Sequence, residues 1–397
     1  MDPVSRPLQD LPSYNASRAG PLESGPIRSV NFAATIKFVT RSRPFPSPQT
    51  EQNLERIDKV LASAGLVRNR RATPPGITAR LRSARRDTAA KEELTKAPPE
   101  TTRFQNGVEL LHIRPWLENK TLKTWLWHGF STRRGGVSRA YCADDSPGEL
   151  NLGFTETDRR EDVESNRRLL AEAVTGSPKT PIIALRQFHS NLVVVAENAD
   201  LQRERPWKAD GIISALPGVL VAIQTADCIP VLVADRRQRI VAAFHAGWRG
   251  TVKRIVELGI GRMRLQFGCK PADLIAAIGP GAGQCCYSVG EELLSEFESQ
   301  FNYARELFRE VYDSDPVRTK YPMLFLTQRA PGHSPIGPQL HLDLIEANRR
   351  QLLDAGIKAS AISITGGCTN CHTDLFFSHR ASRGHAGRMM SVIGVSR

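Results

Sequence analysis

Three side chains in the middle of the chain can together bind a transition metal. Cys228 lies in the segment Thr225-Ala-Asp-Cys, and His245 follows it by 17 residues, at the start of His245-Ala-Gly-Trp-Arg-Gly. His189, in Gln187-Phe-His-Ser, precedes the cysteine by 39 residues. A thiolate and two imidazoles form a borderline-soft donor set that suits zinc, or copper in another geometry. Three protein ligands leave one position of a tetrahedral zinc ion open, as in catalytic sites, so the sequence predicts a catalytic metal centre.

The same residues also allow a metal-free chemistry. Cys228 would act as a nucleophile and His245 as its base, as in cysteine hydrolases. Such a pair has no need of a third ligand, so loss of bound metal on mutation of His189 would separate the two hypotheses. Both stay open at the level of the sequence.

A predicted β-hairpin would bring the cysteine and the second histidine together. Apolar runs at 218–225, 229–234 and 240–244 read as strands, and the polar turn Asp235-Arg-Arg-Gln-Arg joins the second to the third. If the turn centres near residue 237, paired residue numbers sum to about 474 and position 228 faces position 246. Opposed Cβ atoms lie about 4.5–5.5 Å apart in such a pair. A register slip of one residue would turn one side chain to the other face.

Two segments are candidates for binding an anion. Arg249 and its neighbouring glycines open a helix predicted over 251–266, and a helix N-terminus beside a guanidinium attracts anions. Arg133 lies in Ser131-Thr-Arg-Arg-Gly-Gly, where glycines permit close backbone approach. For Arg249, an ordinary helix start with a surface arginine remains an equal alternative.

The remaining cysteine motifs carry weaker signals. Cys368-Thr-Asn-Cys371-His372 matches the pattern of c-type haem attachment, but no export signal accompanies it, so we do not expect haem. No second C-x-x-C is present to complete a four-cysteine zinc knuckle. We expect Cys285-Cys286 to pack in a turn.

The chain divides into two regions. Residues 1–102 contain many prolines and scattered arginines, and residues 1–100 hold 17 Lys and Arg against 10 Asp and Glu. Such a segment cannot bury enough apolar surface to fold, so we predict a disordered extension with at most one short helix at 51–64. Residues 103–397 alternate apolar runs with Gly-rich turns and form the predicted catalytic domain. Strands and helices are mixed there without strict alternation, which favours the α+β class, with 312–338 as a long loop.

Composition excludes several classes of protein. No run of about 18 apolar residues is present, which excludes a membrane-spanning helix, and we see no secretory signal. Seven cysteines without such a signal indicate a reducing compartment, so we expect a cytoplasmic protein. The net charge of +13 leaves nucleic-acid binding by the basic extension as an alternative, although we favour a solvated tail.

Many ordered motifs between residues 103 and 397 resemble the laccase-domain (polyphenol oxidase, YfiH-type) family. The matching segments are His128-Gly-Phe-Ser-Thr-Arg-Arg-Gly-Gly, Asn151-Leu-Gly, Gln187-Phe-His-Ser, Ala209-Asp-Gly-Ile-Ile-Ser, Thr225-Ala-Asp-Cys-Ile-Pro-Val, His245-Ala-Gly-Trp-Arg-Gly-Thr, Ile278-Gly-Pro-Gly, Cys285-Cys-Tyr, Cys368-Thr, Phe376-Phe-Ser-His-Arg and Gly387-Arg.

The resemblance implies a fold, a metal site and an activity. The fold is a layered α/β sandwich similar to that of cysteine-dependent deamidase toxins. The residues matching the family's metal ligands are His189, Cys228 and His245, with zinc as the expected ion and copper as the alternative. The implied activity is phosphorolysis of adenosine, inosine and methylthioadenosine, with deamination of adenosine in some members. The implied partners are a purine nucleoside and phosphate, and the resemblance also leaves a homodimer open.

For phosphorolysis we expect phosphate to rest on basic groups and attack the ribose C1′ while the purine leaves. The candidate substrate and phosphate contacts are Arg133, Gln187, Arg249 and Arg388, and Asp227 is the candidate for proton handling. A copper-dependent polyphenol oxidase is a further alternative. Multicopper oxidation uses more histidine ligands than three, and nine histidines in the whole chain make several clusters difficult to build.

Overall fold

The computed structural model describes residues 98–142, 147–202, 205–311 and 339–397. The predicted helix at 51–64 and the long loop at 312–338 lie outside the described residues, as does nearly all of the predicted extension.

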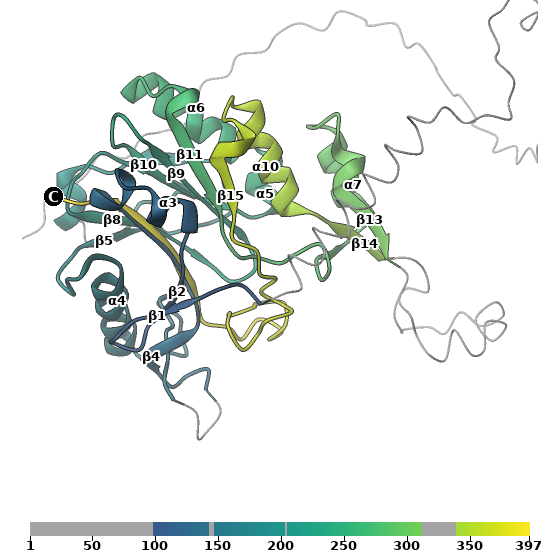
Figure 1. Ribbon diagram of the computed structural model, residues 1–397. Helices are drawn as coiled ribbons and strands as arrows, with labels where there is room; N and C mark the ends of the chain where they lie inside the picture. The colour runs from purple at the N-terminus through teal and green to yellow at the C-terminus, as the bar shows by residue number, and fades with distance from the viewer. Residues whose placement is uncertain (1–97, 143–146, 203–204, 312–338) are drawn as a thin grey trace, which may run out of the picture. The chain divides into compact units, whose positions relative to one another are not determined.

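Two mixed sheets form the centre of the described part of the chain (Figure 1). The first runs in the order β1 (Thr102–Arg103), β2 (Glu109–Leu111), β3 (Leu126–Ser131), β16 (Met389–Val395), β8 (Val219–Thr225) and β5 (Ile182–Ala184). The second runs β15 (Ile362–Ile364), β11 (Leu274–Ile278), β9 (Ile229–Asp235), β10 (Val241–Ala246), β7 (Gly211–Ser214) and β6 (Val193–Val195). A third, smaller sheet runs in the order β12 (Ser288–Val289), β14 (Gln339–Leu342) and β13 (Phe308–Val311). The strand β4 (Arg134–Ser138) lies outside these three sheets.

Helices cover the outer faces of the two large sheets. α4 (Arg160–Thr175) lies against the first sheet, and α6 (Ile255–Phe267) and α10 (Leu344–Asp354) lie against the second (Figure 1). The shorter helices are α3 (Arg114–Glu118), α5 (Trp248–Val252) and α7 (Glu291–Glu298), with 3-10 turns at Leu122–Thr124, Asn198–Gln202, Pro271–Asp273, Ala304–Leu307 and Ala359–Ala361. This helix–sheet–sheet–helix layering confirms the predicted α+β sandwich.

Side-chain alternation along β9 shows how the layers are held together. Val231 and Val233 pack in the cluster formed with α6 and α10, whereas Leu232 and Ala234 pack between the two sheets. Successive strand residues point to opposite faces, so a fully apolar strand can serve two cores at once. This explains why the predicted strand at 229–234 lacks polar residues.

The hairpin register differs from the prediction by one residue. His245 pairs with Pro230 and Ala246 with Ile229, so paired numbers sum to 475 instead of 474. Continuing this ladder places Cys228 across from Gly247 and diagonal to His245. Residues diagonal by two share one face of a sheet. The observed register therefore puts the two ligands on the same face, which the predicted one would not.

The helix predicted over 251–266 is broken into two. α5 ends at Val252 and α6 begins at Ile255, because Arg254 adopts a left-handed conformation with φ 57°. The Thr251 carbonyl accepts hydrogen bonds from Arg254 N and from Gln351 Nε2 of α10. The hydrogen bond from α10 thus occupies the Thr251 carbonyl, where the helix breaks. Apolar periodicity in the sequence does not reveal such a contact.

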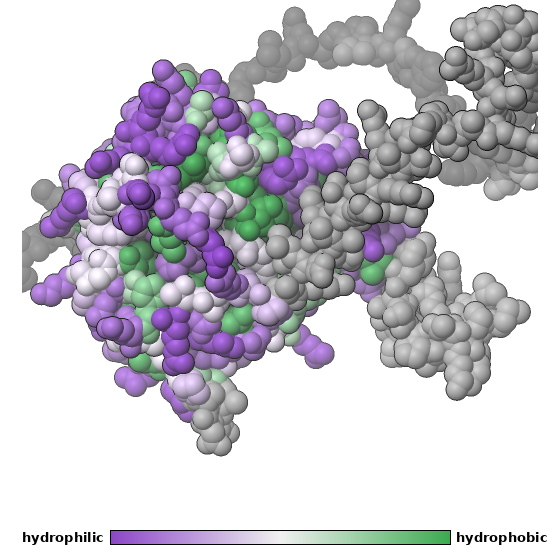
Figure 2. Space-filling view, in the orientation of Figure 1, coloured by the Kyte–Doolittle hydropathy of each residue, from purple (hydrophilic) through white to green (hydrophobic). Residues whose placement is uncertain are grey.

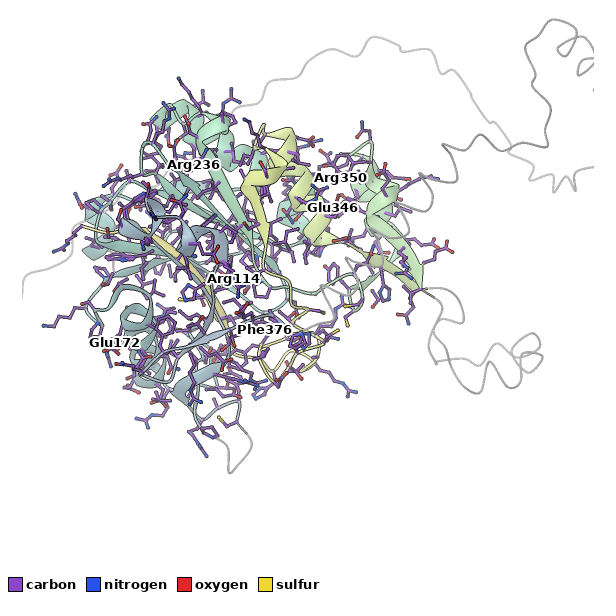
Figure 3. All side chains as sticks on the ribbon, in the orientation of Figure 1. Arg114, Glu172, Arg236, Glu346, Arg350 and Phe376 are labelled. Carbon is purple, nitrogen blue, oxygen red and sulfur yellow. The ribbon has the colours of Figure 1, made fainter. Side chains whose placement is uncertain are left out.

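Polar contacts anchor the outer layer and cover the surface. Glu346 on α10 accepts hydrogen bonds from Arg350 at 3.1 Å and Arg349 at 2.7 Å, and Arg350 also reaches Glu306 (Figure 3). Hydrophilic residues predominate on the face shown in Figure 2, with apolar residues in small spots between them. Within the described residues, no helix combines the length and apolar character that crossing a bilayer requires.

Candidate metal centre

The three predicted ligands lie together at one end of the second sheet. Cys228 immediately precedes β9, His245 lies in β10, and His189 lies between β5 and β6. One ligand atom from each residue lies within 4.8 Å of the other two. Cys228 Sγ is 3.7 Å from His189 Nε2, and the two imidazole rings are 4.9 Å apart between centroids. Tetrahedral zinc places a thiolate sulfur and an imidazole nitrogen about 3.5 Å apart, so the trio fits a metal ion.

Gly247 provides the room for this arrangement. A Cβ atom at this position would lie 2.9 Å from Cys228 Sγ and 3.0 Å from His189 Cδ2. Glycine is needed there for space, since the backbone has an ordinary φ of −66°. His189 has a positive φ of 62°, which turns its side chain back toward the cysteine. The turn is exposed at His189 and half-buried at Cys228, so a substrate can reach the ligands.

Asp210 orients the centre, although it is not among the site residues predicted from the sequence. Its Oδ1 lies 2.8 Å from His245 Nδ1, which directs the other ring nitrogen toward Cys228. The same carboxylate accepts hydrogen bonds from His189 N at 3.0 Å and from both the backbone and the hydroxyl of Ser190 at 2.7 Å. A carboxylate behind a ligating histidine fixes its tautomer and strengthens it as a donor. The motif Ala209-Asp-Gly contains Asp210, but the sequence does not show that His245 is its partner.

The electrostatics of the trio favour a negative sulfur. Burial acts to raise the pKa of Cys228, but the charge of His245 and a hydrogen bond from His189 lower it to about 6. Burial acts to lower the pKa of His245, but Cys228 and Asp210 raise it to about 9. Although burial opposes it, hydrogen bonds from His245 and Ser190 hold the pKa of Asp210 well below its usual range. These shifts favour a thiolate–imidazolium pair, which can act as a nucleophile and can bind a cation when the imidazolium releases its proton.

Asp227 precedes Cys228 in the chain, and both of its carboxylate oxygens accept hydrogen bonds from other segments. Its Oδ1 accepts from the Thr369 hydroxyl and its Oδ2 from Arg380 N, both at 2.7 Å. Its backbone has a positive φ of 98°, a strained conformation for a non-glycine residue. These contacts tie the turn before β9 to the segments around residues 369 and 380. The predicted role in proton handling stays a prediction.

Gln187 uses its amide to hold the His189 turn in place. Its Nε2 donates to Gln224 O at 2.7 Å, and its Oε1 accepts from Gln224 N at 2.6 Å. The side chain thus pairs with the end of β8 as a short strand would. This contact places the turn next to the cysteine, while direct substrate contact by Gln187 stays untested.

The three arginines proposed to bind phosphate lie in different surroundings. Arg249 is exposed, and its guanidinium carbon lies 4.2 Å from the centre of the Trp248 ring. Arg133 pairs with Glu149 at 2.6 Å and lines a cavity of 350 Å³ together with Tyr141 and His385, whereas none of the three ligands lines this cavity. The Arg388 guanidinium donates to the carbonyls of Ala386 and Gly387 in its own loop.

Tyr287 is a further neighbour of the centre that the sequence did not single out. Burial and then the charge of Cys228 raise the pKa of its hydroxyl to about 12, while Arg380 and Arg249 oppose the rise. The same hydroxyl therefore lies within electrostatic reach of the cysteine and both guanidiniums. Of the three predicted arginines, Arg249 is the one whose charge acts on Tyr287. The glycines after Arg133 serve contacts within the protein, since a Cβ at Gly136 would lie 2.3 Å from Glu149 O.

Comparisons with known proteins agree with these features. Residues 127–396 match the family model described as multi-copper polyphenol oxidoreductase laccase. The chain is 31% identical over 271 residues to a purine nucleoside phosphorylase of Bacteroides thetaiotaomicron, covering 67% of this chain and 90% of that protein. It is 30% identical over 233 residues to adenosine deaminase RL5 from an unknown prokaryotic organism, covering 57% and 79%. The crystal structure of the hypothetical protein YfiH of Bacillus licheniformis superposes with a TM-score of 0.60 at 27% identity, covering 75% of this chain and 99% of that one.

Proposed function

The chain belongs to the multi-copper polyphenol oxidoreductase laccase family, and from this premise we propose that it is a metal-dependent purine nucleoside phosphorylase. Its substrates would be adenosine, inosine or methylthioadenosine together with phosphate, and its products a free base and ribose 1-phosphate. Deamination of adenosine would be a second activity. The observation that carries the proposal is the convergence of His189, Cys228 and His245 on one accessible point, in a chain similar to named phosphorylases.

The proposed ion is zinc, with copper as the alternative, held by His189, Cys228 and His245. Such an ion supplies Lewis acidity that polarises a substrate oxygen or nitrogen. The chain's own residues then divide the remaining work. Asp210 fixes the orientation of His245, and Gly247 keeps the space between the ligands open. Tyr287 borders the same point with a hydroxyl able to donate a hydrogen bond.

Phosphate binding is proposed for Arg249, whose charge acts on Tyr287. A guanidinium positions the phosphate for attack on the ribose C1′ and offsets its charge as the glycosidic bond breaks. Arg133 and Arg388 remain weaker candidates, because each guanidinium already has protein partners. Asp227 remains the proposed group for proton handling.

Product analysis tests the proposal directly. The full-length protein is incubated with adenosine, with and without phosphate, and the products are separated. Adenine and ribose 1-phosphate that form only with phosphate support phosphorolysis, and inosine marks deamination. Products that are unchanged by phosphate contradict the phosphorylase proposal.

A cysteine hydrolase is the second candidate, favoured by the thiolate–imidazolium character of Cys228 and His245. The variant His189→Ala separates the two, because a Cys–His pair needs no third residue. The phosphorylase proposal expects metal to be lost from the His189–Cys228–His245 centre together with turnover. Retained turnover in a variant without that ion would favour the hydrolase. Copper oxidation is less favoured, since the candidate metal clusters among the described residues contain only two histidines.

A further inference from the structure

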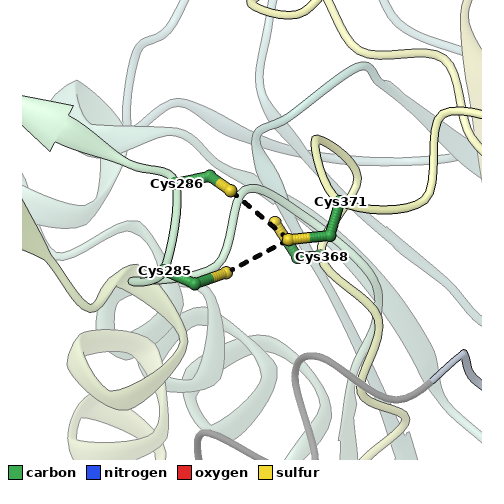
Figure 4. A group of neighbouring side chains, drawn as sticks. All are labelled: Cys285, Cys286, Cys368 and Cys371. Atoms are coloured by element: carbon green, nitrogen blue, oxygen red, sulfur yellow. Dashed lines mark hydrogen bonds between the residues drawn. The ribbon is translucent and has the colours of Figure 1, made fainter. Parts of the chain in front are cut away.

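Four cysteines outside this centre gather at a second point. Cys285 and Cys286 lie in the turn before β12, and Cys368 and Cys371 lie in the loop after β15 (Figure 4). Their sulfur atoms all lie within 4.8 Å of one another. Cys371 Sγ is 3.5 Å from Cys285 Sγ and 3.3 Å from Cys286 Sγ. Cys285-Cys286 lies in a turn, as the sequence predicted, and this adjacent pair also brings its sulfurs beside those of Cys368 and Cys371.

The spacing of the sulfurs matches a metal ion. Zinc–thiolate bonds of about 2.3 Å in a tetrahedron place the sulfurs about 3.8 Å apart. The two shortest separations, 3.3 and 3.5 Å, lie slightly below that value, and all lie within 4.8 Å. All four cysteines are free thiols in the structure. Four donors of this type fill the coordination of a tetrahedral ion, which is the pattern of structural sites.

Backbone contacts hold the two segments in place without the help of an ion. The backbones of Cys368 and Gly281 form an isolated parallel β-bridge. Thr369 N donates a hydrogen bond to Gly281 O at 3.0 Å. Gly283 N donates to Cys368 Sγ at 3.3 Å, and Cys286 N donates to Gly283 O at 2.9 Å. Backbone N–H groups that point at a sulfur stabilise it as an anionic ligand.

Gly283 gives the sulfurs the room to converge. A Cβ atom there would lie 3.3 Å from Cys285 Sγ and 3.2 Å from Cys368 Cβ. Such contacts are tight enough to displace one of the two side chains. The turn around Gly283 is thus shaped to admit sulfur atoms from both segments.

We propose that Cys285, Cys286, Cys368 and Cys371 bind one zinc ion in a closed four-sulfur site, separate from the His189–Cys228–His245 centre. The ion clamps the turn that carries Tyr287 to the loop that carries Thr369. Thr369 donates its hydroxyl to Asp227, next to Cys228, so the clamp supports one wall of the first centre. Because all four positions of the ion are filled by protein, it performs no chemistry and acts on structure alone.

Metal analysis of the full-length protein tests this proposal. The protein is purified under reducing, anaerobic conditions with zinc present, and the zinc content per chain is measured. We expect two equivalents in the wild type and one in Cys368→Ser/Cys371→Ser. The variant His189→Ala/His245→Ala is expected to lose the other equivalent, so failure of the first centre and failure of this one give different results. Cys142→Ser is the matched control and retains both ions.

Cobalt substitution provides a readout that does not depend on a destabilised variant. Cobalt(II) bound by four thiolates gives intense sulfur-to-metal charge-transfer absorption, which we expect in the wild type and in His189→Ala/His245→Ala. The conservative variant Cys371→His is expected to keep an ion with a shifted spectrum. Equal zinc content in wild type and Cys368→Ser/Cys371→Ser overturns the proposal. So does a disulfide among the four cysteines in the anaerobic protein, found by alkylation and mass measurement, or iron in place of zinc.

Discussion

At the scale of single residues, the first centre depends on how closely three side chains can approach one another. Gly247 and Asp210 determine this approach, although neither residue is a ligand. Gly247 leaves space between Cys228 and His189, and Asp210 fixes His245 and the backbone of the His189 turn. Changes at these two residues should therefore affect metal binding before they affect the fold.

Gly247→Ala should weaken zinc binding at the first centre by about tenfold or more, as is usual when the support of a ligand is disturbed. The added methyl group would press on Cys228 Sγ and His189 Cδ2. Competition with a chromogenic chelator measures the change. Gly261→Ala on α6 is the control, because open space surrounds that position. Unchanged affinity in Gly247→Ala would show that the trio can move apart without loss.

Asp210→Asn should also reduce zinc affinity, by about 10- to 100-fold, because an amide cannot accept every hydrogen bond that the carboxylate accepts. Turnover should fall in parallel and recover in part at high zinc concentration. Isothermal titration with zinc measures the affinity. The exposed Asp374→Asn, which lacks contact with the trio, serves as the control. A variant with normal zinc affinity would remove Asp210 from the description of the centre.

Asp227→Asn distinguishes proton transfer from positioning. If Asp227 handles a proton, kcat should fall by about 100-fold or more. Thr369→Val removes one hydrogen bond and keeps the carboxylate, so its kcat should fall far less. If the two variants lose kcat equally, Asp227 is a positioning residue.

At the scale of elements, the hairpin and the broken helix carry the ligands to their places. The one-residue difference in register between β9 and β10 decides that Cys228 and His245 share a face. The separation of α5 from α6 keeps the helix that carries Arg249 short. Both features depend on contacts with other elements, such as the Gln351–Thr251 hydrogen bond from α10.

β3 contains a residue whose titration should affect stability. Burial, reinforced by the nearby His112, lowers the pKa of His128 to about 3, and its Nε2 accepts a hydrogen bond from Ile113 N. In the unfolded chain this imidazole gains its proton near its ordinary pKa of about 6.5, while the folded state stays neutral. Its stabilising contribution is therefore complete above pH 6.5 and falls between pH 6.5 and 3, by at most about 1.4 kcal/mol per pH unit.

His128→Gln should lessen this acid sensitivity, because glutamine offers an acceptor and does not titrate. The free energy of unfolding from urea titrations at pH 7 and pH 4.5 measures the effect. The wild type should lose more stability between the two values than the variant, even if the variant is less stable at pH 7. Equal losses would show that His128 is not responsible.

At the scale of the whole molecule, one layered body carries both proposed metal sites. Residues 127–396 account for the family match, and the described part of the chain begins at Pro98. A cytoplasmic location and a homodimer stay predictions, and nucleic-acid binding by the basic segment stays the alternative that we do not favour. The proposed function requires only the layered body.

Removal of residues 1–97 should therefore leave turnover within about twofold of the full chain, since the deletion keeps Pro99 and β1 in place. Steady-state kinetics on both proteins measure this. Any binding of duplex DNA or RNA by the full chain should weaken as the salt concentration rises, and it should disappear when the basic segment is removed. A loss of turnover on deletion would assign residues 1–97 a role in the reaction.

The sequence alone determined the class of the fold and predicted the three candidate ligands of the first centre. Strands at 229–234 and 240–244 could be predicted because apolar runs and turns are local signals, and His189, Cys228 and His245 could be singled out from donor chemistry and motifs. The break at Arg254 could not be predicted, since apolar spacing does not reveal the hydrogen bond from Gln351.

The tertiary structure alone decided the register of the hairpin, the role of Asp210 and the meeting of four cysteines. The last two depend on contacts between segments far apart in the chain, from 35 residues for Asp210 and His245 to 86 for Cys285 and Cys371, and the register depends on how β9 and β10 pair. No local pattern encodes such pairings, because they arise only when separate strands and loops pack side by side. The adjacent Cys285-Cys286 pair becomes a candidate ligand pair only when packing brings Cys368 and Cys371 to it.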